Sequence, residues 1–597
     1  MGYDSWSSLP AMFFEQAAKL GNRNFLWAKH EGAYQPLTWT EVAESVRALS
    51  RGLRALGLQR GDRVVLVAEN RPEWMIADLA IMAAGGITVP AYTTNTATDH
   101  SYILNHCGAR GAIVSTRALA TKLLAGAVNA PECRFVVAID ELEREQIAPV
   151  SIHAWAAVVA SGRDLADDVD RVVADIEREE VACFIYTSGT GGAPKGVMLS
   201  HRAILTNCMG AYYLLEEIGL GDEVFLCFLP LSHSYEHTAG QFFPISIGAQ
   251  IYYAEGVESL LTNLAEARPT IMTAVPRLYE SMHQRILRAV EKQGGMKQRL
   301  FELAERIGRK RYRDPRSLSL GERLLDLLVE RPVRGKMRAR FGGRLKAMVS
   351  GGAALNPDIG IFFTALGLRV LQGYGQTEAA PVVACNPPRR VKMDTVGPPL
   401  KDVEVRIAED GEILVRGGLV MNGYWQDEEA TRQALRDGWL HTGDVGEFDG
   451  DGYIKITDRK KDIIVLSGGD NISPTRIEGY LTLQPELGQA MVFGDKRPHL
   501  VALLVPDPEF VERFAAERGL PAELAVLSGN DDFRKALAVI VERVNRELSP
   551  LEKVRRFVIA ESAFTVENEM MTPTLKNRRH VIKKAYGSRL EALYERG

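Results

Sequence analysis

The stretch Tyr-Thr-Ser-Gly-Thr-Gly-Gly-Ala-Pro-Lys-Gly, residues 186–196, says most about the fold of this chain. The apolar run before it, residues 181–186, predicts a buried strand. After the glycine-rich loop, Ser200 and His201 begin a segment with a helical pattern. A strand that ends in hydroxyls, backbone N–H groups and one lysine offers a place for a polyphosphate. The sequence therefore predicts a nucleotide as the first ligand to consider.

The loop differs from the phosphate-binding loop of Walker ATPases. That motif places Gly before its Lys and Ser or Thr after it. Here Pro194 precedes Lys195, and Gly196 follows it. The sequence argues against a Walker ATPase and leaves two interpretations, a different phosphate-binding loop or a flexible surface loop.

Length and composition set the broad class of protein. With 597 residues the chain is longer than one hydrophobic core normally grows, so we expect two or more domains. Hydrophobic residues make up 46% and the net charge is −4, which is typical of a soluble globular protein and gives no sign of nucleic-acid binding. The six cysteines form no C-x-x-C pair, and their apolar surroundings predict buried reduced thiols in a cytoplasmic protein. We expect neither a signal peptide nor a membrane span.

Strand-like runs alternate with helix-like runs from about residue 36 onward. This alternation predicts parallel sheets covered by helices, and ligands of such sheets collect at the carboxyl ends of the strands. Polar loops follow three of these ends, beginning at residues 187, 350 and 372, and we expect them to converge on one site. The expected strands are residues 64–68, 111–115, 135–139, 224–229, 271–275, 345–350 and 369–371.

The pattern changes from residue 396. Short strands at 403–407 and 412–415, with a tight turn at 449–452, predict a small antiparallel barrel or sheet. A charged connector, residues 458–462, is followed by enough chain for a separate small domain. We therefore predict an α/β fold with a large N-terminal domain of parallel-sheet subdomains plus a small barrel, residues 1–457, and a small α+β C-terminal domain, residues 458–597.

Five motifs, taken in order, resemble those of the adenylate-forming superfamily, which includes acyl-CoA synthetases, peptide-synthetase adenylation domains and beetle luciferases. The resemblance covers nearly the whole chain, and the segments at 230–237, 273–279 and 571–576 and a helical insertion at about 292–343 are most similar to long-chain fatty acyl-CoA synthetases. The motifs are a phosphate loop at 186–196, Gln-Gly-Tyr-Gly-Gln-Thr-Glu at 372–378, a ribose motif at 439–444, a hinge at 458–462 with the loop at 467–469, and a lysine motif at 573–576 with Arg578 and Arg579.

The resemblance implies an ATP-dependent long-chain fatty acid–CoA ligase that uses ATP, Mg²⁺ and coenzyme A. A carboxylate would attack the α-phosphorus of ATP to form an acyl-adenylate and pyrophosphate, and a thiol would then displace AMP. Thr190 and Glu378 would bind Mg²⁺, and Lys195 would hold the phosphates. Lys576 would stabilise the negative charge of adenylation, and His233 resembles a gate beside the acyl carboxylate.

The implied nucleotide contacts come from the same motifs. Asp444 would accept hydrogen bonds from the ribose hydroxyls, with Arg459 nearby, and Tyr374 would flank the adenine. The full set of implied nucleotide-binding residues is Thr187, Ser188, Gly189, Thr190, Gly191, Lys195, Gly351, Gly352, Ala353, Gln372, Tyr374, Gly375, Thr377, Asp444, Arg459, Ser467, Gly468 and Gly469.

Two positions depart from the family pattern. Gly191 stands where the family usually has a second Thr, which would weaken the hold on phosphate. Leu575 stands where a Gly commonly precedes the lysine, and this leaves Lys583 and Lys584 as substitutes for Lys576.

The phosphate loop and Lys576 fall on different predicted domains. If Lys576 approaches for adenylation, it must leave before the thiol enters. The resemblance therefore implies that the nucleotide- and acyl-binding domain, 1–457, is covered by a mobile lid domain, 458–597, which rotates about Asp458.

Other functions stay open at this point. A fatty acyl-AMP ligase that loads a carrier protein shares the same motifs, and a catalytically silent nucleotide-binding protein would share the fold. The oligomeric state is also open, a homodimer included.

One helix in the insertion has two interpretations. Leu300, Leu303, Ala304 and Ile307 fall on one face, and the basic run 309–313 follows. Such a helix either rests on an anionic membrane or covers the domain core with a solvated basic end, and we favour the second interpretation. We thus expect a cytoplasmic protein and leave peripheral membrane contact open.

Overall fold

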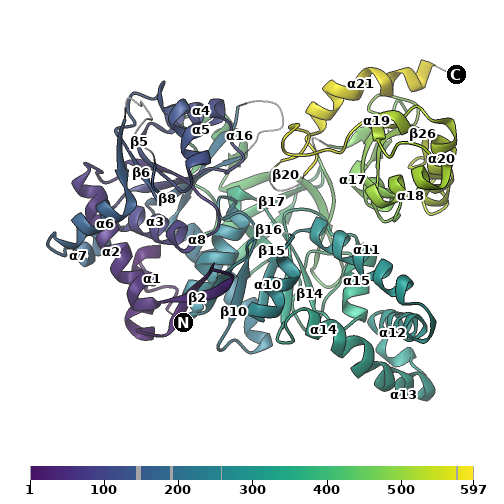
Figure 1. Cartoon of the computed structure of the whole chain (residues 1–597), viewed down its shortest axis with the longest axis horizontal. Coiled ribbons are helices and arrows are strands. Elements are labelled where there is room, and N and C mark those ends of the chain that lie inside the picture. Colours follow the sequence, from purple (N-terminus) through teal and green to yellow (C-terminus); the bar gives the residue numbers. More distant parts are fainter. Residues whose placement is uncertain are drawn as a thin grey trace.

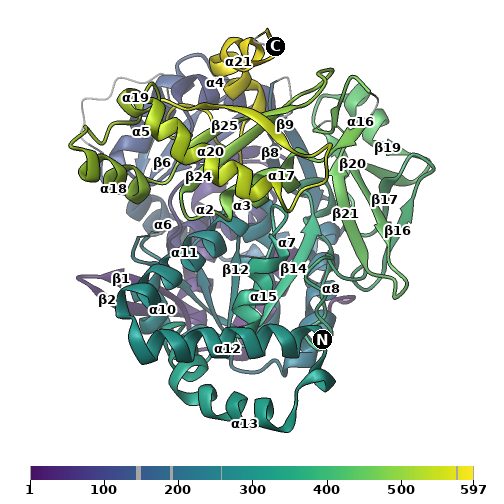
Figure 2. The ribbon, with the colours of Figure 1, turned by 90° about the vertical axis from the view of Figure 1, so that its right-hand side faces the viewer.

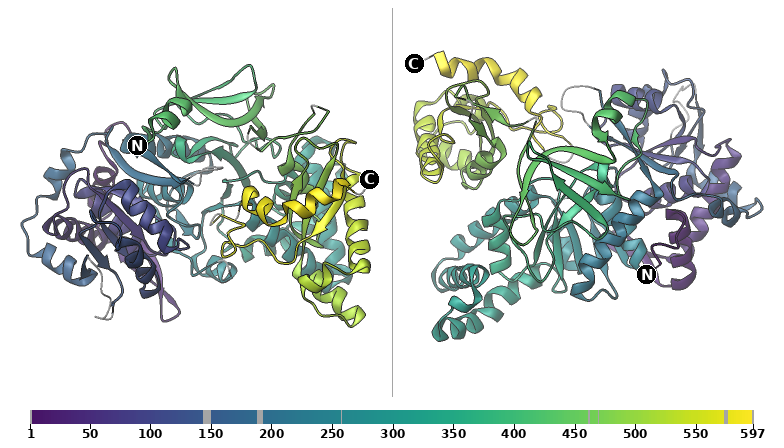
Figure 3. Two further views of the ribbon diagram at one scale, coloured as in Figure 1. Left: turned by 90° about the horizontal axis from the view of Figure 1, so that it is seen from above. Right: turned by 180° about the vertical axis from the view of Figure 1, so that it is seen from behind.

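The structure is a computed structural model that describes residues 2–142, 150–187, 193–256, 258–460, 462–468, 470–572 and 576–595. Two large sheets with their helices form the N-terminal part, and a curved antiparallel sheet lies against them (Figure 1). The C-terminal segment, yellow-green to yellow, packs as a separate body beside this part in both views of Figure 3.

The first eight-stranded sheet has the order β18-β9-β8-β4-β3-β5-β6-β7. Its neighbours from β8 to β7 pair in parallel, as predicted, whereas β9 and β18 are antiparallel additions at one edge. The strands are β3 (Arg63–Val67), β4 (Ile87–Pro90), β5 (Ala109–Val114), β6 (Phe135–Ala138), β7 (Ser151–Ala154), β8 (Val181–Thr187), β9 (Lys195–Ser200) and β18 (Gly423–Tyr424).

The second eight-stranded sheet has the order β15-β14-β13-β12-β10-β11-β1-β2. It is parallel except at its two edges, where β15 and β2 are antiparallel. Together the two sheets contain all seven strands expected from the sequence, with bounds that differ by a few residues. The strands are β1 (Asn24–His30), β2 (Ala33–Thr38), β10 (Val224–Cys227), β11 (Gln250–Tyr253), β12 (Ile271–Ala274), β13 (Ala347–Ser350), β14 (Val370–Gly375) and β15 (Val382–Cys385).

The glycine-rich loop is followed by a strand, β9, that was not predicted from the sequence. The loop joins the antiparallel pair β8 and β9, so Lys195 lies at the start of this strand. The predicted helix, α8 (His201–Leu215), begins only after β9, where the Ser200 hydroxyl accepts a hydrogen bond from the N–H of Ala203.

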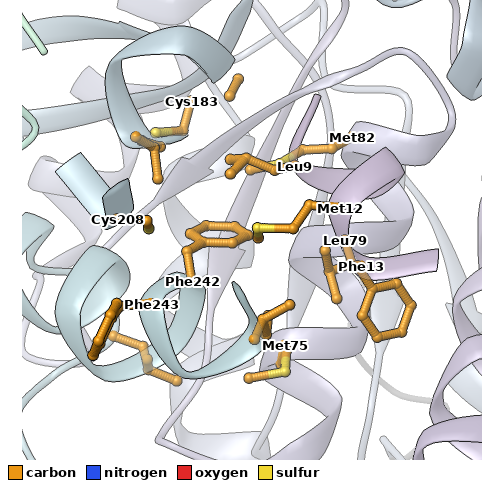
Figure 4. Packing of buried hydrophobic residues seen from close by; sticks show 14 of the residues in the cluster. Leu9, Met12, Phe13, Met75, Leu79, Met82, Cys183, Cys208, Phe242 and Phe243 are labelled. Atoms are coloured by element: carbon orange, nitrogen blue, oxygen red, sulfur yellow. The ribbon is translucent and has the colours of Figure 1, made fainter. Parts of the chain in front are cut away.

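One apolar cluster joins the two large sheets. It contains side chains from β3, β5 and β8 of the first sheet and from β10, β11 and β12 of the second. Figure 4 shows its centre, where α1 (Leu9–Leu20) and α3 (Pro72–Ala83) pack against Phe242 and Phe243. All six cysteines are free and buried, as predicted.

The curved antiparallel sheet extends from the second half of the N-terminal part. It has the order β16-β17-β20-β19, and β21 pairs with the free edge of β20. The predicted tight turn is present, because the N–H of Gly452 donates to the carbonyl of Asp449 at 3.1 Å. The strands are β16 (Val403–Ile407), β17 (Glu412–Gly417), β19 (Leu435–Arg436), β20 (Trp439–Phe448) and β21 (Ile454–Arg459).

The C-terminal segment has its own hydrophobic core. Two apolar clusters fill it, and both consist of residues between Ile464 and Leu590. Two arginines of α11 (Pro276–Gln293) touch it from the N-terminal part: Arg277 donates to the carbonyl of Gly488 at 2.7 Å, and Arg288 donates to Asp507 at 2.8 Å. Its elements are β22 (Ile464–Val465), β23 (Asn471–Ile472), α17 (Pro474–Thr482), β24 (Leu487–Phe493), β25 (Leu500–Pro506), α18 (Pro508–Arg518), α19 (Leu524–Leu527), α20 (Asp531–Asn545), β26 (Val554–Ile559) and α21 (Arg579–Glu595).

The helical insertion lies at the outer edge of the N-terminal part (Figure 2) and contains α12 (Gly295–Arg313), α13 (Leu320–Val329) and α14 (Lys336–Arg340). Ala304 and Ile307 are buried, and Leu300 and Leu303 pack against the hydrophobic cluster that contains Ala304. The interpretation that this face of α12 covers the domain core is therefore confirmed. No helix in the described part of the chain is long and apolar enough to span a bilayer.

A buried carboxylate anchors the π-helical segment η2 (Glu236–Phe242), which directly follows the loop that carries His233. Asp78 on α3 accepts hydrogen bonds from His237 at 2.9 Å and from Gln241 at 2.8 Å, and all three side chains are buried. His237 is thus a structural residue.

We expect Asp78→Ala to lower the free energy of unfolding by about 2–4 kcal/mol, because two buried donors lose their acceptor. Urea denaturation measures the change. Asp78→Asn, which keeps one acceptor, should cost less. As a control, Glu404→Ala breaks an exposed ion pair with Arg416 and should cost less than about 1 kcal/mol. Equal costs for Asp78→Ala and the control would contradict the anchoring role.

Candidate active site

A cleft of about 3320 Å³ is lined by residues of both the N-terminal part and the C-terminal segment. Of the three polar loops predicted to converge, those beginning at residues 350 and 372 line this cleft, as do Thr187 and Lys195 at the described ends of the first loop. The cleft lining includes the predicted site residues Thr187, Lys195, His233, Gly351, Gly352, Ala353, Gln372, Tyr374, Gly375, Thr377, Glu378, Asp444, Arg459 and Lys576.

Asp444 is a buried carboxylate with two fixed neighbours. Tyr374 donates to its Oδ2 at 2.7 Å, and Arg459 donates through Nε to its Oδ1 at 2.8 Å. The pairing of β20 with β21 sets this geometry, since Asp444 and Arg459 lie opposite each other in the ladder. An ionised carboxylate has about four acceptor positions, so about two remain for ligand hydroxyls.

Glu378 and Lys195 lie on either side of Tyr424. The Tyr424 hydroxyl donates to Glu378 Oε1 at 2.9 Å, and the Lys195 ammonium lies 5.0 Å from the centre of the Tyr424 ring. Lys195 also lies 3.3 Å from Asp427 Oδ2. Glu378 lines the cleft, and a carboxylate oxygen is a hard ligand that suits Mg²⁺.

Two glycines allow close approaches that a side chain would prevent. A Cβ on Gly351 would lie 2.9 Å from Cζ of Tyr235, whose hydroxyl donates to the carbonyl of Val349. A Cβ on Gly375 would lie 1.8 Å from the carbonyl oxygen of Pro381. The backbone of both loops is therefore packed tightly where it borders the cleft.

His233 is held as a neutral hydrogen-bond donor. Its Nδ1 accepts from the N–H of Tyr235 at 3.2 Å, so the ring proton sits on Nε2. Burial, together with the positive charge of Lys576, lowers the pKa of His233 to about 3.

Lys576 brings a positive charge from the C-terminal segment into the cleft. Burial lowers its pKa from 10.5 to about 8, and the neighbouring Arg459 acts in the same direction. The carboxylate of Asp444 opposes both effects. The cleft thus offers a hydroxyl-binding carboxylate, a lysine and a neutral histidine beside one another, a set that suits a nucleotide and a second, anionic ligand.

The comparisons with known proteins agree with this geometry. Residues 13–425 match the model described as AMP-binding enzyme, and residues 461–597 match the model of the AMP-binding enzyme C-terminal domain. The chain belongs to the AMP-binding enzyme family. Long-chain-fatty-acid–CoA ligase FadD15 of Mycobacterium bovis is 34% identical over 575 residues, which cover 95% of this chain and 93% of that protein.

Two further proteins extend the comparison. Long chain acyl-CoA synthetase 7, peroxisomal, of Arabidopsis thaliana is 31% identical and covers 94% of this chain and 82% of its own length. Among solved structures, the A-PCP didomain of carboxylic acid reductase from Segniliparus rugosus in complex with AMP superposes with a TM-score of 0.79 at 22% identity, covering 98% of this chain and 82% of that one. This structural likeness establishes the α/β fold of the AMP-binding enzyme.

Not all predicted site residues of the AMP-binding enzyme are found in the described lining of the cleft. Ser188, Gly189, Thr190, Gly191 and Gly469 fall outside the described residues. Ser467 and Gly468 are exposed on the turn between β22 and β23 and are absent from the lining of the cleft. The N–H of Ser467 donates to the carbonyl of Arg497 at 3.0 Å, which holds this turn against the C-terminal segment.

Sequence reasoning missed Tyr424 and Asp427. Both touch predicted site residues, yet they lie between motifs that the resemblance identified. Their signal is the run Gly-Tyr-Trp-Gln-Asp at residues 423–427, directly before the acidic first turn of α16 (Glu428–Ala434). An aromatic pair followed by a helix-capping Asp is a feature that a search for site residues could have included.

The charges around Lys576 predict two opposite shifts. Asp444→Asn removes a negative charge and should lower the pKa of Lys576 below about 8, whereas Arg459→Gln removes a positive charge and should raise it. NMR titration of reductively methylated lysines measures both shifts, with Lys576→Arg to assign the signal. Asp402→Asn, an exposed change outside the cleft, is the control. Unchanged midpoints in both cleft variants would show that Lys576 lies away from this pair.

Proposed function

We propose that this chain is an ATP-dependent long-chain fatty acid–CoA ligase. It joins a fatty acid to AMP with release of pyrophosphate, and then transfers the acyl group to CoA with release of AMP. The observation that carries the proposal is the shared cleft, where Lys576 of the C-terminal segment meets Asp444, His233 and Glu378 of the N-terminal part. The names of the relatives that match nearly the whole chain support the acyl and thiol substrates.

The nucleotide is held first. The free acceptor positions of Asp444 take the two ribose hydroxyls, and Arg459 and Tyr374 keep the carboxylate in place. The adenine lies against the close-packed backbone of residues 351–353. Lys195 holds the phosphates, with Asp427 and the Tyr424 ring orienting its ammonium.

Glu378 would hold the Mg²⁺ that accompanies ATP, together with Thr190, which lies outside the described residues. Mg²⁺ supplies charge neutralisation at the phosphate oxygens. Tyr424 donates to one oxygen of Glu378 and leaves the other for the ion.

His233 and Lys576 act on the acyl carboxylate. The Nε2–H of neutral His233 donates to one carboxylate oxygen, while the ammonium of Lys576 lies between the carboxylate and the α-phosphate. One carboxylate oxygen forms a bond to the α-phosphorus as the bond to the pyrophosphate oxygen breaks, and no proton is transferred. Lys576 stabilises the charge that this step concentrates, a kind of contact whose loss often costs about 10²–10³ in rate.

The second step needs room for a thiol. We assign residues 1–457 to the nucleotide- and acyl-binding domain and 458–597 to the lid domain, with the hinge at Asp458. The separate core of the C-terminal segment supports this division, because a unit with its own core can rotate without unfolding. A rotation about Asp458 removes Lys576 and opens the path of CoA to the adenylate.

We propose that the ligase works in the cytoplasm and makes peripheral contact with membranes, because long-chain fatty acids partition into lipid. A homodimer is compatible with this function but is required by none of its steps.

Pyrophosphate release tests the function directly. Across a series of fatty acids, we expect turnover that depends on CoA, because adenylation and thiol transfer use the same cleft. Turnover should be greatest for long acyl chains. Lys576→Ala should lower turnover about 10²–10³-fold, whereas Lys584→Ala, an exposed lysine on α21, should leave it nearly unchanged. Pyrophosphate release that ignores CoA but requires a carrier protein would identify an acyl-AMP ligase, and no release with any acid would indicate a silent nucleotide-binding protein.

Restricting the hinge should separate the two half-reactions. Asp458 is the second-last residue of β21, and burial raises its pKa to about 6. Asp458→Pro fixes the backbone there, so we expect adenylate formation within about tenfold of normal and thioester formation depressed by about 10² or more. Single-turnover assays measure each step. Asp458→Ala controls for the lost carboxylate, and equal losses of both steps in Asp458→Pro would contradict the hinge.

A further inference from the structure

Helix α13 exposes a stripe of leucines to solvent. The exposed fractions are 84% for Leu320, 62% for Leu324, 73% for Leu327 and 62% for Leu328. These positions follow the spacing i, i+4, i+7 and i+8, so they share one face of the helix. Single exposed leucines are ordinary, but four on one face of a ten-residue helix form a contiguous apolar surface, which we call the leucine stripe.

The opposite face of α13 is occupied by contacts with the rest of the insertion. Val329 is the one buried residue of the helix. Glu322 accepts from Lys310 at 2.8 Å, and Asp326 accepts from Arg311 at 2.9 Å and from Arg334 at 2.6 Å. Both acids of α13 are therefore neutralised on the inner side, and the outer side keeps only apolar and basic residues.

The insertion is strongly basic. Residues 292–344 contain 16 Lys and Arg against 6 Asp and Glu, a net charge of +10, whereas the whole chain has −4, so the remainder carries −14. Arg323 and Arg331 are exposed beside the leucine stripe, and neither forms an ion pair with another described residue. An apolar stripe between unpaired arginines is complementary to a surface that is apolar inside and negatively charged outside.

We propose that the leucine stripe and its flanking arginines dock this protein on a bilayer surface rich in anionic lipid. Leucines enter the boundary between headgroups and acyl chains, and the arginines contact the headgroups. A second copy of the chain is a poorer occupant, since a symmetric pair would bring two regions of charge +10 together.

The position of α13 suits this role. Figures 1 and 2 place it at the outer edge of the molecule, beyond α12 and away from the C-terminal segment. Helix α12 packs on α15 (Pro357–Ala365), so closely that a Cβ on Gly308 would lie 2.6 Å from Ala365. Docking through α13 thus leaves the C-terminal segment free of the bilayer.

This inference deepens the peripheral membrane contact that was proposed with the ligase function, and its test measures binding without turnover. The quadruple variant Leu320→Gln, Leu324→Gln, Leu327→Gln and Leu328→Gln should bind vesicles of phosphatidylcholine and phosphatidylglycerol about a hundredfold or more weakly in co-sedimentation. The double variant Arg323→Gln and Arg331→Gln should lose about tenfold or more on these vesicles and little on neutral ones.

A matched control removes exposed apolar residues elsewhere. Leu165→Gln, Leu261→Gln and Val539→Gln change side chains that are also exposed, by 44%, 46% and 71%, but lie outside the insertion, and vesicle binding should persist. Since the six native cysteines are buried, an environment-sensitive dye on Leu327→Cys reports insertion selectively. We expect a blue shift with anionic vesicles and none without them.

Three results would overturn the proposal. The first is wild-type binding that ignores lipid charge and salt. The second is a quadruple variant that binds as well as the control. The third is a wild-type dimer that the quadruple variant dissociates, which would make the stripe a subunit interface. Pyrophosphate release with a dispersed short-chain acid should be unchanged in all these variants, so a failure of docking leaves the ligase function standing, and loss of the ligase function leaves docking measurable.

Discussion

The antiparallel pairing of β20 with β21 is the constraint on which the site depends. One ladder places Asp444 opposite Arg459 and Val445 opposite Asp458. The carboxylate that faces the cleft and the residue proposed as the hinge are therefore neighbours on the same two strands. Because Arg459 fixes Asp444 and directly follows Asp458, the proposed rotation at Asp458 would be transmitted to the contacts of that carboxylate.

Charge balance in the cleft follows from this pair. Asp444 and Arg459 nearly neutralise each other, and Lys576 adds a positive charge that burial makes costly, as its lowered pKa indicates. An anionic ligand would relieve that cost. A nucleotide with an acyl carboxylate is such a ligand, so its binding favours the arrangement in which Lys576 occupies the cleft. Product release and the proposed rotation would reverse this preference, because the ammonium would regain water on leaving the cleft.

Much of the fold could be predicted from the sequence, since buried parallel strands are continuous apolar runs and β10 and β12 stand out as such. The strands at the edges of the sheets were harder to predict from the sequence. β9 was missed because Lys195 and Gly196 open a strand whose pairing depends on backbone groups of β8, which carry no side-chain pattern. Motifs identified Asp444 and Lys576, but Tyr424 and Asp427 meet Glu378 and Lys195 only through tertiary packing.

The exposed leucines of α13 illustrate a further limit. Sequence periodicity finds an amphipathic helix but not the direction in which its apolar face points, and it therefore singled out α12. In the structure the apolar face of α12 packs on the core. The two acidic residues of α13 form ion pairs with basic residues of α12, and its leucines face outward. Which face is covered depends on the ion pairs between helices, and those pairs join residues that no local pattern links. Polar contacts also hold the C-terminal segment, through Arg277 and Arg288. Water can replace these hydrogen bonds at little cost in free energy. Because the segment has its own core, the proposed rotation would not expose that core.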